Sequence, residues 1–119
     1  MNVATVRWCV LIPCFNEAAA IGSVIDSVLA LGAAVIVVDD GSDDGTAEIA
    51  AALPITVLRH ARRCGKGAAL RHGFREALRM GYDCVLTMDG DGQHLTSDLP
   101  HIVAAAAQHP AHLVIGARL

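Results

Sequence analysis

The sequence predicts an α/β fold, in which a mostly parallel sheet is covered by helices on both faces. Short runs of apolar residues alternate with longer segments whose apolar residues recur every three or four positions. The short runs are typical of strands buried on both faces, and the longer segments are typical of amphipathic helices. A third observation is that polar residues cluster directly after the strands. At 119 residues, the chain fits one small domain.

The expected strands are five short runs of aliphatic and β-branched residues. The first run stops at Pro13, because proline has no N–H to donate within a sheet. The second run is β-branched and too short for a helix. In chain order, the five runs are residues 7–12, 35–38, 55–58, 84–88 and 113–115.

Four helices are expected between these strands. The first covers residues 18–31, with Asn16 as its N-cap and Gly32 as its stop signal. Its apolar face consists of Ile21, Val24, Ile25, Val28 and Leu29. A short second helix covers residues 46–53.

The third and fourth helices follow the same pattern. The third covers residues 66–80 and ends at Gly81, while the fourth covers residues 97–108 and tolerates Pro100 in its first turn. The predicted inward residues are Leu70, Phe74, Ala77 and Leu78 in the third helix, and Leu99, Ile102, Val103 and Ala106 in the fourth.

The composition excludes several classes of protein. With 54% apolar and 18% charged residues, the chain is not expected to be disordered. A net charge of -3 gives no attraction to nucleic acid or to an anionic membrane, and two Phe, one Trp and one Tyr offer few stacking surfaces for single strands. No apolar run approaches the 18 or so residues that a membrane span needs.

The four cysteines form no CxxC pair and lie in or beside apolar stretches. We therefore expect Cys9, Cys14, Cys64 and Cys84 to be small buried hydrophobic residues in a reducing compartment. A zinc site would call for closer Cys and His spacing.

Polar segments follow the first four predicted strands, whereas the opposite loops are plain turns. In an open parallel sheet, all the carboxyl ends of the strands lie at one edge, where ligands bind. The segments contain Asn16 and Glu17 after the first strand, residues 39–45 after the second, Arg59, Arg62, Arg63 and Lys66 after the third, and residues 89–94 after the fourth. This asymmetry is the strongest indication of a functional site.

Asp89 and Asp91 stand one residue apart, and the glycines beside them let the loop bend so that both carboxylates face one ligand. Two carboxylates this close favour a cation between them, and oxygen ligands favour Mg²⁺ or Mn²⁺. Gln93 could supply a third oxygen. The alternative is a solvated acidic turn. His94, next to this loop, is a candidate substrate contact.

Two further positions predict contacts with a nucleotide. Asp40 is placed to accept hydrogen bonds from a base or ribose, as strand-end acids do in nucleotide folds. Lys66, the only lysine, lies at a helix start, where backbone amides favour phosphate. Asp39 is expected to be half-buried, and Asp43 and Asp44 are expected to serve the turn.

Other nucleotide and hydrolase motifs fail. A P-loop would need glycine at His60 and Ser or Thr at Gly67, and a dinucleotide fingerprint would need glycine at Leu70. The histidines and serines form no hydrolytic triad. A sugar nucleotidyltransferase would begin with a glycine-rich basic loop, and residues 13–17 are not one.

Five segments together resemble family 2 glycosyltransferases with the Rossmann-like GT-A fold, above all the dolichyl-phosphate and polyprenyl-phosphate sugar transferases. Their order and spacing extend over nearly the whole chain. The segments are residues 12–17 (IPCFNE), 37–46 (VVDDGSDDGT), 65–69 (GKGAA), 88–94 (MDGDGQH) and 115–118 (IGAR).

The resemblance implies inverting, metal-dependent transfer of a sugar from a UDP- or GDP-linked donor to a lipid-phosphate or glycan acceptor. It implies that Asp89, Asp91 and Gln93 hold the divalent cation, with Asp89 and Asp91 as the catalytic pair. The implied nucleotide-binding residues are Pro13, Phe15, Glu17, Asp40, Lys66, Gly90 and Arg118. The sequence departs from the family at Phe15, where tyrosine is common, and at Arg63, where asparagine is usual.

In the family, an acceptor-binding segment and interfacial or membrane helices follow these motifs. Residues 1–119 are thus expected to be the donor-binding part of the domain, without the C-terminal acceptor part. The expected location is the cytoplasm, at the inner face of the membrane. The open sheet edge near residues 113–115 favours a homo-oligomer. The alternative function is an inactive module that binds nucleotide sugars.

Overall fold

The computed structural model describes residues 7–90 and the backbone of 113–116. Its five strands form one sheet in the order β3-β2-β1-β4-β5, and every adjacent pair is parallel. The strands are β1 (Trp8–Cys14), β2 (Ala34–Asp39), β3 (Thr56–Arg59), β4 (Cys84–Thr87) and β5 (Leu113–Gly116), and the helices are α1 (Ile21–Leu29), α2 (Thr46–Ala51) and α3 (Lys66–Arg79). The predicted α/β architecture is confirmed. The helix predicted over residues 97–108 lies outside the described residues.

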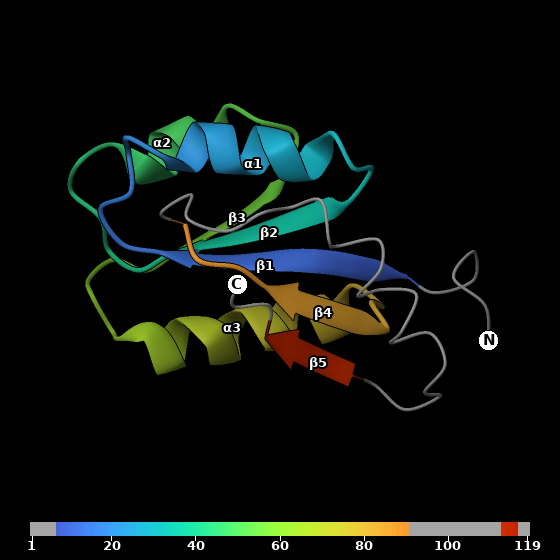
Figure 1. Cartoon of the computed structure of the whole chain (residues 1–119). Helices are drawn as coiled ribbons and strands as arrows, with labels where there is room; N and C mark the ends of the chain where they lie inside the picture. The colour runs from blue at the N-terminus through green and yellow to red at the C-terminus, as the bar shows by residue number, and fades with distance from the viewer. Residues whose placement is uncertain (1–6, 91–112, 117–119) are drawn as a thin grey trace.

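Helices cover both faces of the sheet: α1 and α2 pack on one face and α3 packs on the other (Figure 1). The side chains of β1 alternate between two apolar clusters, with Val10 and Ile12 toward α1 and with Cys9 and Leu11 toward α3. All four are fully buried. Burial on both faces explains why the strands are apolar throughout rather than alternating with polar residues.

Strand β1 runs on to Cys14, so the prediction that it stops before Pro13 is wrong. Pairing between β1 and β4 ends at Leu11, whereas pairing with β2 continues through Pro13 and Cys14. Pro13 is therefore in a stretch with a strand on one side only, where sheets tolerate proline.

The N-cap prediction for Asn16 is wrong, because α1 begins at Ile21 with Ala20 as its N-cap. Asn16 instead adopts a left-handed conformation, with φ of 53°. Its backbone N–H donates to Ser42 Oγ at 2.8 Å, and its side-chain oxygen accepts the N–H of Asp43 at 3.1 Å. Asn16 thus joins the loop after β1 to the loop after β2.

The glycine stop signals and the turn role of Asp44 are confirmed. Gly32 and Gly81 follow α1 and α3 with φ of 79° and 86°. Asp44 accepts the backbone N–H groups of Thr46 and Ala18, each at 3.1 Å.

The face of α3 that meets the sheet differs from the prediction. Leu78 is 59% exposed, and Ala69, Gly73 and Ala77 are the buried residues of this helix. Leu70 and Phe74 pack beside them, as predicted. The helix is rotated toward its small residues because Gly73 lies against Leu11 of β1.

Two burial predictions are also corrected. Cys9, Cys14 and Cys84 are buried as expected, and burial raises the pKa of the Cys9 and Cys14 thiols to about 12. Cys64 is exposed, because it lies in the loop between β3 and α3 rather than in an apolar element. Asp39 is fully buried, not half-buried.

We predict that Gly73→Ala destabilises the protein by about 1–3 kcal/mol, the usual cost of overpacking a core. A Cβ at this position would lie within 3.0 Å of three carbons of the buried Leu11 side chain. Urea unfolding measures the effect.

The control is Gly67→Ala in the same helix, where the nearest atom is the end of the Arg71 side chain at 3.3 Å. Greater helix propensity should leave this variant as stable as the wild type or up to about 1 kcal/mol more stable. Equal destabilisation of both variants would contradict the account of the contact between α3 and β1.

Candidate functional site

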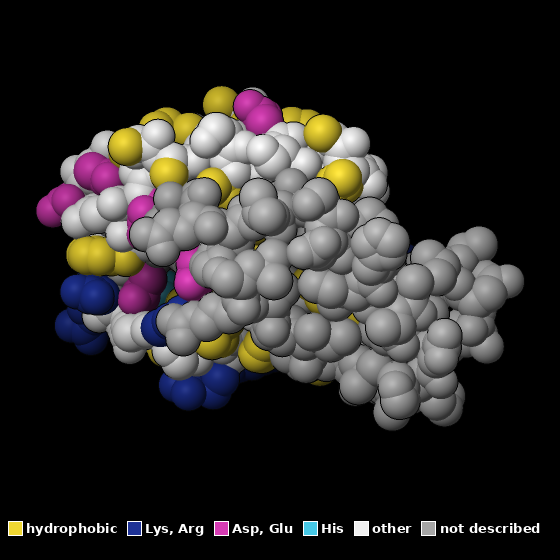
Figure 2. Space-filling model, viewed as in Figure 1, with side chains coloured by type: hydrophobic (Ala, Val, Ile, Leu, Met, Phe, Trp, Pro, Cys, Tyr) yellow, Lys and Arg dark blue, Asp and Glu magenta, His cyan; other side chains and the backbone are white. Residues whose placement is uncertain are grey.

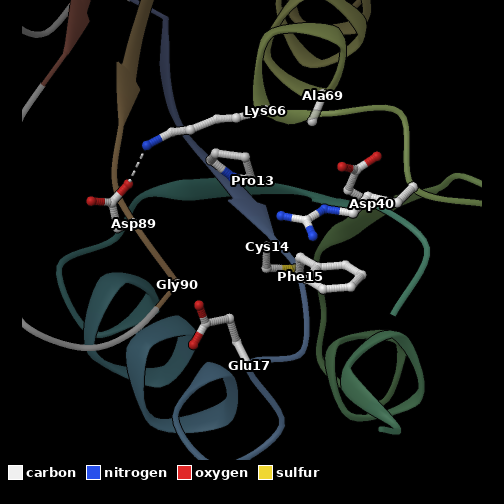
Figure 3. Close-up of a pocket in the computed structure, with 10 residues that line it drawn as sticks. Pro13, Cys14, Phe15, Glu17, Asp40, Lys66, Ala69, Asp89 and Gly90 are labelled. Atoms are coloured by element: carbon white, nitrogen blue, oxygen red, sulfur yellow. Dashed lines mark hydrogen bonds and ion pairs between the residues drawn. The ribbon is translucent and has the colours of Figure 1, made fainter. Parts of the chain in front are cut away.

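The described residues form a pocket at the carboxyl ends of β1, β2 and β4. From β1 the chain passes outward to β2 and β3, then returns to β4 on the other side of β1. Such a reversal opens a crevice between the loops of an open sheet. The pocket has a volume of about 280 Å³. It is lined by Pro13, Cys14, Phe15, Glu17, Asp40, Arg63, Lys66, Ala69, Asp89 and Gly90 (Figure 3).

Seven of the predicted site residues meet in this pocket: Pro13, Phe15, Glu17, Asp40, Lys66, Asp89 and Gly90. The other predicted residues, Asp91, Gln93 and Arg118, and the candidate His94 lie outside the described residues. Sequence reasoning missed Cys14 and Ala69, which lie within otherwise predicted segments. It named Arg63 among the polar residues after the third strand and as a departure from the family pattern, but not as a site residue.

Asp40 holds the loop between β3 and α3 against the end of β2. Its buried carboxylate accepts the backbone N–H of Cys64 at 2.8 Å and that of Gly65 at 2.9 Å. It also lies 2.8 Å from His60 Nδ1. Burial acts to raise the pKa of Asp40, but these three hydrogen bonds outweigh it and lower the pKa below its ordinary value of 3.8. The carboxylate is therefore ionised at neutral pH, and it fixes the start of α3.

Asp39 organises the same edge from the opposite side of β2. Its carboxylate accepts the N–H of Ser42 at 3.2 Å and lies 4.0 Å from Arg59 Nε. The next turn brings the loops after β2 and β3 into contact. A Cβ on Gly41, which has φ of 80°, would lie 2.6 Å from backbone atoms of both Arg62 and Arg63. This position requires glycine for its conformation and for its space.

Arg63 and Phe15 stack on one another at the pocket. The guanidinium carbon of Arg63 lies 4.1 Å from the centre of the Phe15 ring, which is a cation–π contact. The ring lies in the loop after β1 and the arginine in the loop after β3, so this contact closes the pocket across the end of β2.

Lys66 and Asp89 face one another across the pocket, from the start of α3 and from the segment after β4 (Figure 3). Lys66 Nζ lies 3.0 Å from Asp89 Oδ1, and the two side chains are 53% and 26% exposed. Ion pairs this exposed contribute at most about 1 kcal/mol to stability. The pair therefore adds little to the stability of the fold.

Gly90 lets the segment after β4 pass close to the loop after β1. A Cβ on Gly90 would lie 3.1 Å from Cys14 Cβ and 3.4 Å from Glu17 Cγ. Glu17 is held by its backbone N–H, which donates to Thr46 Oγ1 at 3.0 Å. Acidic and basic side chains gather around this end of the molecule, where the strands finish (Figure 2).

We predict that Asp40→Asn lowers the free energy of unfolding at pH 7 by about 1–3 kcal/mol, because its amide group would oppose buried N–H donors. The pKa of Asp40 is lowered in the folded chain, so its contribution is fully present above pH 3.8 and is lost as the pH falls through the folded value. The free energy of unfolding of the variant should therefore fall less than that of the wild type as the pH is lowered from 5. Urea unfolding at each pH measures this difference.

Asp26→Asn, on the exposed face of α1, is the control and should change stability by less than about 0.5 kcal/mol. Identical unfolding of the wild type and Asp40→Asn at pH 7 would refute this role.

Two curated relatives of this chain have names that refer to mannose on a polyprenol or undecaprenyl phosphate. It is 34% identical to a polyprenol monophosphomannose synthase of Mycolicibacterium smegmatis, over 96% of this chain and 46% of that protein. It is 43% identical to an undecaprenyl-phosphate mannosyltransferase of Micrococcus luteus, over 71% of this chain and 36% of that protein. The chain thus spans about half or less of the length of these relatives.

Two solved structures with a similar fold are named as synthases of a glycosylated phosphoglycerate. Mannosyl-3-phosphoglycerate synthase from Rubrobacter xylanophilus matches with a TM-score of 0.73 and 26% identity, over 90% of this chain and 38% of that one. Glucosyl-3-phosphoglycerate synthase from Mycobacterium tuberculosis, in complex with Mn²⁺, UDP and glucosyl-3-phosphoglycerate, matches with a TM-score of 0.61 and 34% identity. That match covers 73% of this chain and 34% of the other.

The sequence model described as Glycosyl transferase family 2 matches residues 9–119, which is nearly the whole chain. All ten residues that line the pocket lie within this matched range. The chain belongs to glycosyl transferase family 2.

Proposed function

We propose that this chain supplies the donor site of an inverting, metal-dependent glycosyltransferase that moves a sugar from a nucleoside diphosphate to a polyprenyl phosphate. The observation that carries the proposal is the meeting of Phe15, Glu17, Asp40, Lys66 and Asp89 in one pocket of a family 2 chain. These residues are spread over 75 positions of the sequence and come from four separate strand-end segments.

The base and ribose would lie against the ends of β1 and β2. Pro13 and Phe15 offer apolar surface, and Glu17 and Asp40 offer carboxylates, on adjoining walls of the pocket. The Phe15 ring is stacked against Arg63. A planar base can take the same kind of contact with the ring, with the exposed Arg63 moving aside or covering the base. The complex of a structural relative with UDP supports a uridine or similar nucleoside here.

The diphosphate would lie at the start of α3. This helix has 14 residues, its N-cap is Gly65, and no side chain caps its first turn. The N–H groups of an uncapped helix start, together with the helix dipole, favour an anion. Lys66 adds a full positive charge at the same place, so the diphosphate can draw on both.

The residues at the end of β4 fit a divalent cation. Asp89 places a carboxylate on the pocket wall, 3.0 Å from Lys66 Nζ. This carboxylate already pairs with one positive charge, and a divalent cation could take the place of the lysine. With Asp91 and Gln93, which follow in sequence, it would form the all-oxygen set that Mg²⁺ or Mn²⁺ prefers. When bound, the cation would neutralise the charge that develops on the leaving diphosphate. The Mn²⁺ in a relative's complex supports this assignment.

The acceptor proposed here is a lipid phosphate, as in the names of two curated relatives. A phosphate oxygen is already anionic, so direct attack on the anomeric carbon needs little help from a general base, and it inverts that carbon. Such an acceptor would bring the chain to a membrane surface. Within the described ranges 7–90 and 113–116, no helix is long and apolar enough to cross a bilayer.

A transfer assay separates this function from donor binding alone. Radiolabelled UDP- and GDP-linked sugars would be incubated with Mn²⁺ and polyprenyl phosphate, and label in the lipid fraction would be counted. Label transfer supports the transferase. Tight donor binding without transfer to the lipid would instead support a nucleotide-sugar-binding module, since the pocket residues assigned here all serve the donor.

We predict that Mn²⁺ tightens UDP binding at least about tenfold, or about 1.4 kcal/mol, and that Asp89→Asn removes most of this effect. The amide keeps the size of the side chain but loses the charge that would hold the cation. Calorimetry with UDP, in Mn²⁺ and in EDTA, gives both affinities. Asp26→Asn, which is exposed on α1 and does not line the pocket, serves as the control and should keep the full Mn²⁺ effect. An undiminished effect in Asp89→Asn would refute the assignment.

We predict that Lys66→Met weakens UDP binding about tenfold, because a charge-assisted contact with the diphosphate is lost. Binding of uridine, which has no phosphate, should change less than twofold. The matched control is Arg75→Met, which removes an exposed positive charge further along the same helix and should leave both affinities unchanged. Equal losses for UDP and uridine would mean that Lys66 shapes the pocket rather than holding phosphate.

A further inference from the structure

Three side chains of different metal-binding chemistry meet at Asp40, one of the residues that line the pocket. A carboxylate oxygen of Asp40, a ring nitrogen of His60 and the sulfur of Cys64 all lie within 4.8 Å of one another. They come from the end of β2, the end of β3 and the approach to α3. Among the described residues, no other group of His, Cys, Asp and Glu side chains has this arrangement.

We propose that Asp40, His60 and Cys64 form a binding site for Zn²⁺. Thiolate, imidazole and carboxylate are the three protein ligands that zinc takes, and a hard cation such as Mg²⁺ does not favour the sulfur. Ionised Asp40 and Cys64 bring two negative charges, which match the charge of the cation. Three protein ligands leave the fourth tetrahedral position to water. This site shares Asp40 with the proposed donor pocket, and it differs in chemistry from the oxygen site at Asp89.

The surroundings of the three ligands are those of a metal site. Zinc-binding histidines nearly always donate their second ring N–H to a neighbour, which fixes the ring. His60 has such a neighbour, because its Nε2 lies 2.9 Å from His72 Nδ1 and the planes of the two rings are within 4° of one another. The carboxylate of Asp40 is oriented by the backbone N–H groups of Cys64 and Gly65. The loop around the site is therefore already ordered.

The geometry needs only a small adjustment. His60 Nδ1 and Asp40 Oδ1 are 2.8 Å apart, whereas two ligand atoms bound tetrahedrally to zinc lie about 3.3 Å apart. Opening this pair by about half an ångström makes room for the ion at that bond length. Cys64 is exposed, so the ion can enter from solvent, and the sulfur can rotate away from its present contact with the Arg62 carbonyl at 3.3 Å.

Binding of Zn²⁺ to the three ligands releases one proton, from the Cys64 thiol. Without metal, ionised Asp40 only accepts, so His60 Nδ1–H donates to it and His60 Nε2 accepts from His72 Nδ1–H. With Zn²⁺ on Nδ1, His60 carries its proton on Nε2 and donates to His72 Nδ1, while His72 carries its own on Nε2. The Cys64 thiol loses its proton to solvent and binds as thiolate.

The experiment uses Co²⁺ as a spectroscopic substitute for Zn²⁺ in the 119-residue chain, with the Asp89→Asn change to weaken the oxygen site. We expect a thiolate-to-cobalt charge-transfer band that saturates at one equivalent and disappears on addition of Zn²⁺. Cys64→Ser should abolish the band. Cys84→Ala, which removes a buried thiol, should keep it. His72→Phe should keep the band but weaken Zn²⁺ binding about 10–100-fold, as loss of an orienting partner does.

A measurement on the wild type needs no substitution. Iodoacetamide should alkylate the exposed Cys64, and mass spectrometry can follow the rate of this reaction. Zn²⁺ should slow the alkylation at least about tenfold, whereas Mg²⁺ should not. A missing charge-transfer band, a band that survives in Cys64→Ser, or alkylation that Zn²⁺ leaves unchanged would overturn the site. None of these readouts involves UDP or transfer, so the zinc site and the glycosyltransferase function can fail separately.

Discussion

The site depends on one buried carboxylate. Asp40 stands at the end of β2 and accepts hydrogen bonds from the loop that leads into α3, at Cys64 and Gly65. This contact fixes where α3 begins. The position of Lys66 at the pocket follows from that start, and the Arg63 side chain over Phe15 follows from the same loop. The Asp40 carboxylate thus positions both Arg63 and Lys66 on this side of the pocket.

The sheet topology explains why the rest of the site arrives at the same place. Every strand runs in one direction, so the polar segments after β1, β2, β3 and β4 emerge at one edge. The order of the strands reverses between β1 and β4, and the loops there diverge and leave a crevice. The apolar strands therefore place distant carboxylates and the single lysine together.

The sequence predicted the fold well because strands buried on both faces and helices with one apolar face leave different patterns. Strand-end polarity likewise pointed to Glu17, Asp40, Arg63, Lys66 and Asp89 of the pocket, and the resemblance to family 2 added Pro13, Phe15 and Gly90. Two of the errors share one cause, which is contact with distant parts of the chain. Asn16 binds the loop after β2 instead of capping α1, and Leu78 turns outward because Gly73 fits against Leu11. The group of Asp40, His60 and Cys64 escaped notice because Asp40 comes from another strand, 24 positions before Cys64.

Charge balance links the Lys66–Asp89 pair to the proposed chemistry. A lysine and a carboxylate 3.0 Å apart, both partly exposed, add little to stability. A nucleoside diphosphate with its cation carries the same two charges in complementary positions. If it binds as we propose, the phosphates meet Lys66, the cation meets Asp89, and each side chain exchanges one opposite charge for another. Before the donor binds, Lys66 and Asp89 neutralise one another. Because this ion pair is weak, separating it costs at most about 1 kcal/mol.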